Sequence, residues 1–479
     1  MADLHWMTAR ELALALANRE VSSVEAVEHF GARIEALDGP INSVVLTDLD
    51  RARKEAAAID AARLKGDALG PLAGVPMTVK DSFSTAGMTT TSGSPTLADH
   101  VPEEDAWPVA AMRSAGAVIV GKTNLPIWAG DLQSYNDVYG TTNNPFDVAR
   151  TPGGSSGGSA AALACGFTPL EIGSDIGGSI RIPSHMAGVV GHKPSYGIVP
   201  AHGQIPGPPG TLTLADLAVA GPMARSIDDL ELGLNLMSGP NRWEHPAWKL
   251  ELPEPRGNST ISDFRIAAWI DDEHCPIDGE SKRLLERTVE QLRGAGATVD
   301  DGARPGFSLE KVARTFNSLL QAALAGGESR ETIEIFAAET GEGFAADSKR
   351  ALGMRHREWL SNNERRLQMR RQWEQFFQSF DVALLPVCML PALEHDHGPT
   401  GERVVEVNGH SRSYWEMITW MAPAGACYLP ATVIPIGTTS AGLPVGIQIV
   451  GPYLHDHTTL EFARQLTSIV GPIPRPVGF

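Results

Sequence analysis

The chain has 479 residues, 42% of them hydrophobic and 20% charged, which is typical of a folded globular protein and excludes a disordered one. Its formal net charge of -18 repels phosphate backbones, so we expect no nucleic acid partner. Cys165, Cys275, Cys388 and Cys427 form no CxxC pair, which argues against a zinc ribbon or a disulfide framework and favours a cytoplasmic location.

The N-terminal part is expected to be helical. Residues 1–23 carry charges through their apolar stretch, which is typical of an amphipathic helix and not of a signal peptide. Apolar residues recur every three or four positions across 8–65, where Ser22 and Ser23 are candidate N-caps and Gly66 ends the last helix. No stretch of about 18 uncharged apolar residues occurs, so we expect no membrane partner.

Beyond residue 70, short β-rich runs alternate with helical stretches. The runs lie at 71–81, 115–123, 168–178 and 188–199, and Gly and Pro punctuate them. Residues 226–380 are mostly helical and polar, with the charged run 354–380 interpreted as a solvated helix face, and strand patterns return after 380. This pattern predicts the α/β class: a single α/β/α layered domain with a central mixed, largely buried sheet and surrounding helices.

Residues 116–123, GAVIVGKT, match the nucleotide-binding P-loop pattern letter for letter. A working P-loop wraps its four variable residues around phosphate, with the backbone amides pointing inward. Here those residues are Ala-Val-Ile-Val, which favour a strand and leave Lys122 at the end of that strand. We therefore predict that this stretch binds no nucleotide.

Residues 153–157, GGSSG, match the pattern that presents a nucleophilic serine, here Ser155, in α/β-hydrolases. A helical stretch follows, but polar, proline-containing residues stand where the pattern requires a strand. An α/β-hydrolase-type esterase, with a later Asp and His completing its triad, stays open as an alternative.

Two His-Asp-His stretches, 395–397 and 455–457, each offer two imidazoles to a metal ion. Neither lies in a clear strand pattern, and no third ligand stands at a fixed spacing. We interpret both as solvated loop histidines and expect no metal.

Two glycine–serine segments, 151–159 and 173–184, are flanked by strongly structured sequence, as expected where backbone must approach a ligand closely. In the second, the amides before Ser179 lack obstructing side chains and are suited to an oxyanion hole. A serine nucleophile needs a base, and no histidine nearby is an obvious one. Lys80 ends an otherwise apolar strand, and burial can make a lysine amine available near neutral pH.

With these segments in view, the chain resembles the amidase signature family. The matching segments occur in the right order over nearly the whole chain and are densest between 70 and 235. They are GVPMTVKD, GKTN after the GAVIV strand, GGSSGGS, GSDIGGSIRIPS, KPSYGIVP, GPMARSIDDL and GLPVGIQIVG. The resemblance also explains the P-loop match, because GKTN is a strand-to-turn element of that family.

The resemblance implies a Ser–cis-Ser–Lys triad: Ser179 as nucleophile, Ser155 as the bridging serine after a cis peptide bond, and Lys80 as base. It also implies oxyanion amides at Ile176, Gly177 and Gly178, and supporting roles for Ser156, Asp175 and Arg181. The expected reaction is hydrolysis of carbon–nitrogen bonds in aryl or alkyl amides, extending to esters and carbamates (urethanes), through a serine acyl-enzyme without a cofactor.

One branch of that family is the glutaminase subunit of a tRNA-dependent amidotransferase, which has Thr and Gln where this chain has Ile176 and Ile182. Because Ile182 offers glutamine no hydrogen bond, we expect a stand-alone amidase for small apolar or aromatic substrates, and the amidotransferase glutaminase is the alternative. We expect a monomer or homodimer. By position, the candidate pocket walls are Ile127, Trp128, Leu132, Gln133 and Ile182.

The resemblance makes residues 1–479 a single domain. Its expected parts are N-terminal helices (1–66), a catalytic core (67–235), a variable, mostly helical substrate-side region (236–425), and C-terminal core strands with a helix (426–479).

Overall fold

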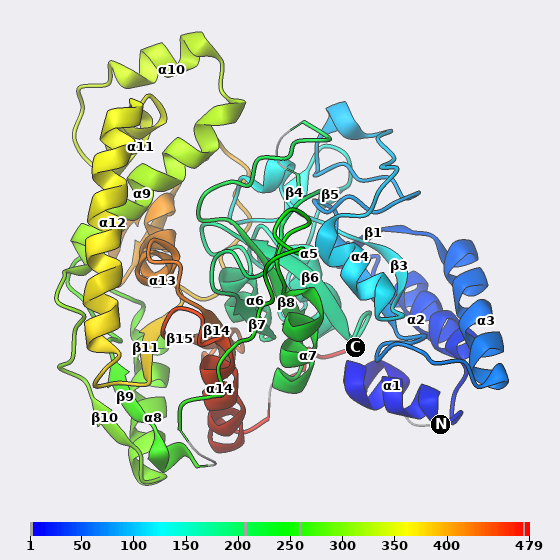
Figure 1. Cartoon of the computed structure of the whole chain (residues 1–479). Helices are drawn as coiled ribbons and strands as arrows, with labels where there is room; N and C mark the ends of the chain where they lie inside the picture. Colours follow the sequence, from blue (N-terminus) through cyan, green and yellow to red (C-terminus); the bar gives the residue numbers. More distant parts are fainter. Residues whose placement is uncertain (1–2, 206–207, 258–259, 473–474) are drawn as a thin grey trace.

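The computed structural model describes residues 3–205, 208–257, 260–472 and 475–479 (Figure 1). The helices are α1 (Ala9–Ala17), α2 (Ser23–Leu37), α3 (Leu49–Lys65), α4 (Trp107–Ser114), α5 (Gly157–Ala164), α6 (Arg181–Ala187), α7 (Ile227–Met237), α8 (Gly279–Gly294), α9 (Leu309–Leu324), α10 (Arg330–Ala337), α11 (Phe344–Leu352), α12 (His356–Phe376), α13 (Ala422–Gly425) and α14 (Asp456–Val470). The strands are β1 (Val44–Thr47), β2 (Pro76–Lys80), β3 (Val118–Thr123), β4 (Tyr135–Asn136), β5 (Gly140–Thr141), β6 (Leu170–Asp175), β7 (Val190–Lys193), β8 (Val219–Ala224), β9 (Arg265–Ala268), β10 (Thr298–Asp300), β11 (Val382–Pro386), β12 (Val404–Val407), β13 (His410–Ser413), β14 (Ala431–Thr438) and β15 (Pro444–Val450).

The largest sheet has eight strands in the order β10-β9-β11-β15-β14-β7-β8-β6. The pairs β10–β9 and β9–β11 are parallel, and the remaining pairs are antiparallel. Strands β6, β7, β8, β11 and β15 are buried along their whole length. Of these, β11 and β15 are largely apolar in sequence, whereas β6 and β7 bury polar and charged side chains. The predicted mixed, largely buried sheet with surrounding helices is confirmed.

A second sheet, in the order β1-β3-β2, carries the strand that ends at Lys80. Strand β2 runs parallel to β3 and lies next to β6, the edge strand of the large sheet. The carboxyl end of β6 leads into the second glycine–serine segment. The two sheets thus bring the candidate lysine and the candidate serine loop to one place.

Several strands lie where the sequence suggested helix. Strand β1 interrupts the expected helical region 8–65, and β9 and β10 interrupt 226–380. β1 pairs antiparallel with β3, and β9 pairs parallel with β11, so each short segment becomes a strand through a partner far along the chain. The expected helix ends agree better with the structure: Ser22 caps α2, whose first residue is Ser23, and Gly66 ends α3 in the left-handed conformation.

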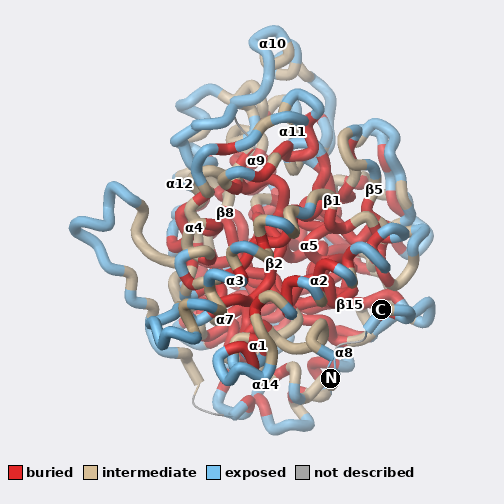
Figure 2. The backbone as a smooth tube through the Cα atoms, turned by 90° about the vertical axis from the view of Figure 1, so that its right-hand side faces the viewer, coloured by how far each residue is buried: buried red, intermediate tan, exposed pale blue. Residues whose placement is uncertain are grey.

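The helices cover both sides of this sheet system. Figure 1 shows α1–α3 at one end of the molecule and α9–α12 as a column at the opposite end. Buried residues fill the centre, whereas α10 is exposed (Figure 2). The main core cluster runs from Ala9 to Leu466 and so draws on most of the chain. None of the helices in the described part of the chain is long and apolar enough to cross a membrane.

Candidate active site

Lys80 lies at the carboxyl end of β2 and is fully buried. Its Nζ donates hydrogen bonds to the hydroxyl oxygens of Ser155 at 2.7 Å, Ser156 at 2.9 Å and Ser174 at 3.0 Å. Burial lowers its pKa to about 7, although the carboxyl groups of Asp175 and Glu171 act in the opposite direction. In a substantial share of the molecules, the Lys80 amine is therefore uncharged at neutral pH.

Ser155 lies in an irregular segment that precedes α5, and the Gly154–Ser155 peptide bond is cis. The backbone passes very close to its neighbours here: a Cβ on Gly154 would stand 2.7 Å from main-chain atoms of residues 131–133. No strand leads into Ser155, since residues 151–156 form neither helix nor strand. The strand–turn–helix context of an α/β-hydrolase nucleophile is thus missing in this described segment.

Ser179 lies in the turn between β6 and α6 and is almost fully buried. The amide of Ser156 donates to the Ser179 carbonyl oxygen at 3.1 Å, which ties this turn to the segment that holds Ser155. Within the residues that the structure describes, the Ser179 hydroxyl has no hydrogen-bond partner, so the link from Ser155 to Ser179 remains a proposal.

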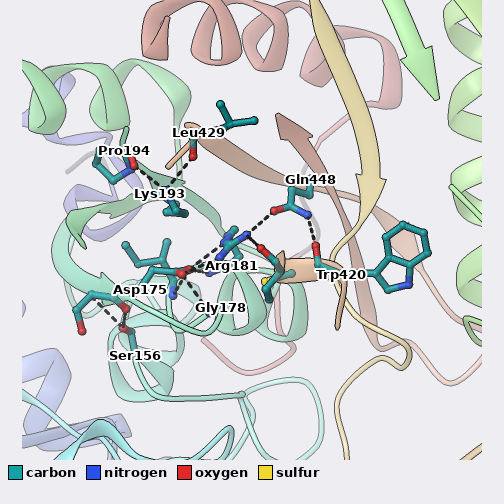
Figure 3. Close-up of polar contacts among 12 residues, drawn as sticks. Ser156, Asp175, Gly178, Arg181, Lys193, Pro194, Trp420, Leu429 and Gln448 are labelled. Atoms are coloured by element: carbon teal, nitrogen blue, oxygen red, sulfur yellow. Dashed lines mark hydrogen bonds and ion pairs between the residues drawn. The ribbon is translucent and has the colours of Figure 1, made fainter. Parts of the chain in front are cut away.

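The turn around Ser179 is organised by Asp175 (Figure 3). The Gly178 amide donates to its Oδ1 at 3.0 Å, and the Ile180 amide donates to its Oδ2 at 3.1 Å. This differs from the expectation that Gly178 supplies an oxyanion donor, because its N–H is already bonded to a carboxylate. In the described part of the chain, the amides of Ile176 and Gly177 carry no such bond.

A buried ion pair supports Asp175 from the other side. Arg181 Nη2 contacts Asp175 Oδ1 at 2.8 Å, and its Nη1 donates to Gln448 Oε1 at 2.6 Å. Gln448 in turn donates to the Trp420 carbonyl oxygen at 3.1 Å (Figure 3). Burial acts to raise the pKa of Asp175, but the Arg181 guanidinium, Lys193 and the Ile180 amide together outweigh it, so this pKa lies below its usual value. The carboxylate therefore stays charged and holds the turn.

This arrangement joins a lysine on a buried strand, a serine after a cis bond and a glycine-rich serine turn, all of which the family resemblance requires. The amidase family model matches residues 25–460. The chain belongs to the amidase family.

Individual amidase-family proteins match the chain from end to end. One glutamyl-tRNA(Gln) amidotransferase subunit, from Moorella thermoacetica, is 32% identical and aligns over 96% of each chain. A crystal structure of an amidase is 29% identical, with a TM-score of 0.78 over 97% of this chain and 100% of the other. A structure from work on the origins of an s-triazine catabolic enzyme is 27% identical, with a TM-score of 0.81 over 98% and 100%.

The predicted pocket walls of this amidase-family chain divide into two sets. Ile127 and Trp128 are 44% and 37% exposed, so both are accessible to a ligand. Leu132, Gln133 and Ile182 are buried, and Gln133 uses both ends of its amide on the backbone of Asp396. Gln133 lines a cavity together with Leu390, Leu393 and Tyr414. The place of Leu132 and Ile182 in the substrate pocket stays a prediction.

Other side chains surround the turn that contains Gly177 and Gly178. A Cβ on Gly178, where φ is +108°, would meet Met421 at 2.7 Å and Ile182 at 2.9 Å. A Cβ on Gly177 would meet Leu320 of α9 at 3.9 Å and nothing closer, so this side of the turn is open. Sequence reasoning missed Leu320, because α9 has an ordinary amphipathic pattern.

The P-loop match of this amidase-family chain is a strand, as predicted. Residues 118–123 form β3, and Lys122 is buried within it. Its Nζ donates to the Phe83 carbonyl oxygen at 2.5 Å and to the Thr85 hydroxyl at 2.8 Å, and it lies 3.9 Å from Asp81. Lys122 is therefore engaged by the loop after β2 and unavailable to phosphate.

The stretch 455–457 is less solvated than expected, whereas Asp396 and His397 lie in a loop and are exposed, as expected. Asp456 is fully buried at the start of α14, where it accepts hydrogen bonds from Ser195 at 2.7 Å and lies 3.1 Å from His192. His397 stacks on Tyr135 with ring centroids 3.9 Å apart. Packing against distant segments explains the difference. Across the described residues, no group of three or more His, Cys, Asp or Glu side chains is arranged to hold a metal ion.

Proposed function

We propose that this amidase-family chain is a serine hydrolase of amides, with Ser179 as nucleophile, Ser155 as bridging serine and Lys80 as base. The observation that carries the proposal is the 2.7 Å hydrogen bond between the buried Lys80 amine and the Ser155 hydroxyl. A general base works best when its pKa is near the operating pH, and burial brings the pKa of Lys80 to about 7.

In the proposed reaction, neutral Lys80 takes the proton of Ser155 while Ser155 takes the proton of Ser179. The Ser179 oxygen bonds to the substrate carbonyl carbon, and the π electrons move to oxygen. Collapse of this tetrahedral species breaks the carbon–nitrogen bond, and the relay gives its proton to the departing amine. Water then hydrolyses the acyl ester by the same relay, which releases the acid and restores Ser179.

The relay requires the hydroxyl of Ser179 to approach that of Ser155. Catalytic hydrogen bonds are often long before substrate binds, so the unpaired Ser179 hydroxyl is compatible with this step. The bond from the Ser156 amide to the Ser179 carbonyl already keeps the two segments adjacent. For the oxyanion we propose the amides of Ile176, Gly177 and Ser179 itself. One such donor is worth about 3 kcal/mol in other hydrolases.

We propose an apolar or aromatic acyl group as the preferred substrate part. The side chains packed against the glycine turn are Leu320, Met421 and Ile182, and all three are apolar. Free glutamine carries an ammonium and a carboxylate, and burying these charges costs free energy unless charged groups of the protein pair with them. Esters and carbamates present the same carbonyl carbon to Ser179 and are further candidate substrates.

A second candidate is the glutaminase subunit of a tRNA-dependent amidotransferase. The curated relatives favour it over a stand-alone amidase, since the Moorella protein, which aligns over 96% of its length, bears the name of an amidotransferase subunit. The same three residues would then release ammonia from glutamine, and a partner would hold the tRNA. The two candidates share the nucleophile and differ in substrate and partner.

The test uses the purified full chain, a fluorophosphonate probe and a substrate panel of aryl amides, esters, carbamates and glutamine. We expect labelling and aryl amide turnover in the wild type, loss of both in Ser179→Ala, and wild-type behaviour in Ser262→Ala, an exposed serine. Labelling that survives Ser179→Ala would overturn the nucleophile. Ammonia release from glutamine without aryl amide turnover would select the second candidate.

A further inference from the structure

The segment 131–134 packs directly against the segment 153–157, which carries Ser155. A Cβ on Gly154 would stand only 2.7 Å from each of three main-chain atoms of residues 131–133. The missing side chain of Gly154 therefore lets the two main chains touch at the residue before Ser155. Because no space separates the two segments, a shift of 131–133 would be passed on to this serine.

Ser134 adds hydrogen bonds to this contact. Its hydroxyl donates to the Gly153 carbonyl oxygen at 3.0 Å and accepts from the Gly157 amide at 3.1 Å. Ser134 is almost fully buried, and the two glycines flank Ser155 on either side. One side chain thus fixes both ends of the short segment that presents the Ser155 hydroxyl to Lys80.

Asp131 anchors the start of the segment 131–134 through its buried carboxylate. Its Oδ2 accepts hydrogen bonds from Arg403 Nη1 at 2.7 Å and from the Tyr135 hydroxyl at 3.1 Å. Its Oδ1 accepts from the Tyr414 hydroxyl and from the Leu132 amide, each at 2.6 Å. Both carboxylate oxygens are therefore held by two donors each.

Two of these donors belong to the β12–β13 hairpin, far along the chain from Asp131. Arg403 directly precedes β12 and Tyr414 directly follows β13, so both ends of the hairpin hold the same carboxylate. The Arg403 side chain is only 1% exposed, and its other carboxylate contact, Asp396, is more distant at 3.9 Å. Separating a buried ion pair is strongly disfavoured, so the pair keeps the hairpin and the segment 131–134 together.

The main chain just before Asp131 needs such an anchor. Trp128 and Ala129 adopt left-handed backbone conformations, with φ of +54° and +55°. Residues with a side chain rarely adopt this conformation, and it persists only where surrounding contacts hold it. The hydrogen bonds of Asp131 follow directly after this turn and supply such contacts.

We propose that Asp131, paired with Arg403, is a positioning residue for Ser155. The pair fixes the segment 131–134 and, through it, the place of the Ser155 hydroxyl in the proton relay. The inference rests on the proposed function, since it concerns Ser155 as the bridging serine. Asp131 contacts no reacting atom, and its effect passes through the main chain.

Asp131→Asn tests this role, because it keeps the volume and removes the charge that binds Arg403. A displaced relay slows the chemical step but leaves substrate binding intact. We therefore expect kcat for an aryl amide to fall by about 10- to 100-fold, with KM changed by less than about twofold. A folded Asp131→Asn enzyme with the wild-type kcat would overturn the inference, and so would a loss of kcat/KM that lies mainly in KM.

The matched control is Asp229→Asn, the same change at another buried carboxylate. Asp229 lies on α7 and accepts from the amides of Ala9 at 2.8 Å and Arg10 at 3.0 Å. Helices α1 and α7 carry none of the proposed catalytic residues. We expect Asp229→Asn to lower the melting temperature and to keep the wild-type kcat. An equal loss of kcat in both variants would show general destabilisation and refute the positioning role.

A double variant tests the pairing with Arg403. If the two residues act as a unit, Asp131→Asn combined with Arg403→Met should lose no more kcat than the worse single variant. Losses that multiply in the double variant would overturn the pairing. If these variants do not fold, Ser134→Ala removes only the hydroxyl that bonds the two glycines and should lower kcat with KM preserved; an unchanged kcat there is equally decisive against the inference.

Ser155→Ala separates this inference from the proposed function. Loss of turnover in Ser155→Ala together with the wild-type kcat in Asp131→Asn would refute only the role of Asp131. Turnover retained in Ser155→Ala would refute Ser155 as the bridging serine, and the role of Asp131 with it.

Discussion

Arg181 is fully buried, and its partners are what make that burial possible. Removing an ionised group from water costs several kcal/mol unless charge pairing and hydrogen bonds replace the hydration. Arg181 has Asp175 for charge pairing and Gln448 and the Met421 carbonyl oxygen for its remaining N–H groups. Because Asp175 also binds the Gly178 amide, the stability of this set and the shape of the Ser179 turn are coupled.

Gln448→Leu tests this coupling. The change takes an acceptor from Arg181 and a donor from the Trp420 carbonyl oxygen while keeping a similar volume. Buried groups left unpaired cost about 1–3 kcal/mol each, so we expect the free energy of unfolding to fall by about 2–4 kcal/mol. Urea unfolding of the purified chain measures this loss.

The control for that variant is Gln368→Leu on the exposed side of α12, where the glutamine amide donates to Glu364. A surface change of this kind should stay within about 0.5 kcal/mol. Equal stability of the two variants would show that Gln448 does not support Arg181.

At the scale of elements, α12 is more than the solvated face expected from its charges. It buries Asn362, Arg366, Met369 and Trp373. Arg366 Nη1 lies 2.8 Å from Asp216 Oδ2, and its guanidinium stacks over Tyr428 at 4.5 Å from the ring centroid. Arg366, together with the Tyr428 hydroxyl that also donates to Asp216, holds the described segment 208–217 in place. The charge pattern alone could not distinguish Arg366 from its exposed neighbours.

Arg366→Met keeps much of the apolar stem and removes the charge that holds Asp216. We expect the segment 208–215 to open more often, since a segment with few buried contacts is held by its few polar ones. Cleavage there by a nonspecific protease should accelerate at least about tenfold, which corresponds to roughly 1.4 kcal/mol of local stability. Mass spectrometry of the fragments locates the cut. Arg365→Met, at an exposed position, should cleave at the wild-type rate.

At the scale of the whole molecule, the net charge of -18 governs encounters with other charged molecules. The range of this repulsion is about 8 Å at physiological salt. It does not affect a neutral amide, and it opposes a phosphate backbone. The charge therefore bears on the choice between the two candidate functions.

We expect the purified chain alone to leave bulk tRNA unshifted in a gel mobility assay at about 0.15 M salt, because it offers few phosphate contacts from which counterions would be released. A salt-sensitive shift by the chain alone would contradict this expectation. A shift that appears only with an added partner protein would agree with the charge argument and support the amidotransferase candidate.

Much of this protein could be predicted from sequence alone. The strands at 76–80, 118–123 and 444–450 carry strong local patterns, and the order of the glycine–serine segments was enough to identify the family. The same segments nominated Lys80 and Ser155, which the structure brings to 2.7 Å. The local sequence pattern was sufficient in these cases, because a buried strand or a glycine-rich turn restricts the residue types at several neighbouring positions at once.

Tertiary structure alone decided the remaining features, because each depends on a partner distant in sequence. Strand β1 forms by pairing with β3, and the side-chain amide of Gln133 donates to the backbone of Asp396, 263 residues away. The Gly178 amide could be excluded as a free donor only once Asp175 was seen to accept it. Glu171 is visible in the sequence as a carboxyl group in β6, but only the structure shows that the Thr78 hydroxyl, 93 residues away, donates to it. Such contacts cannot be predicted from local periodicity, because they form only when the chain folds.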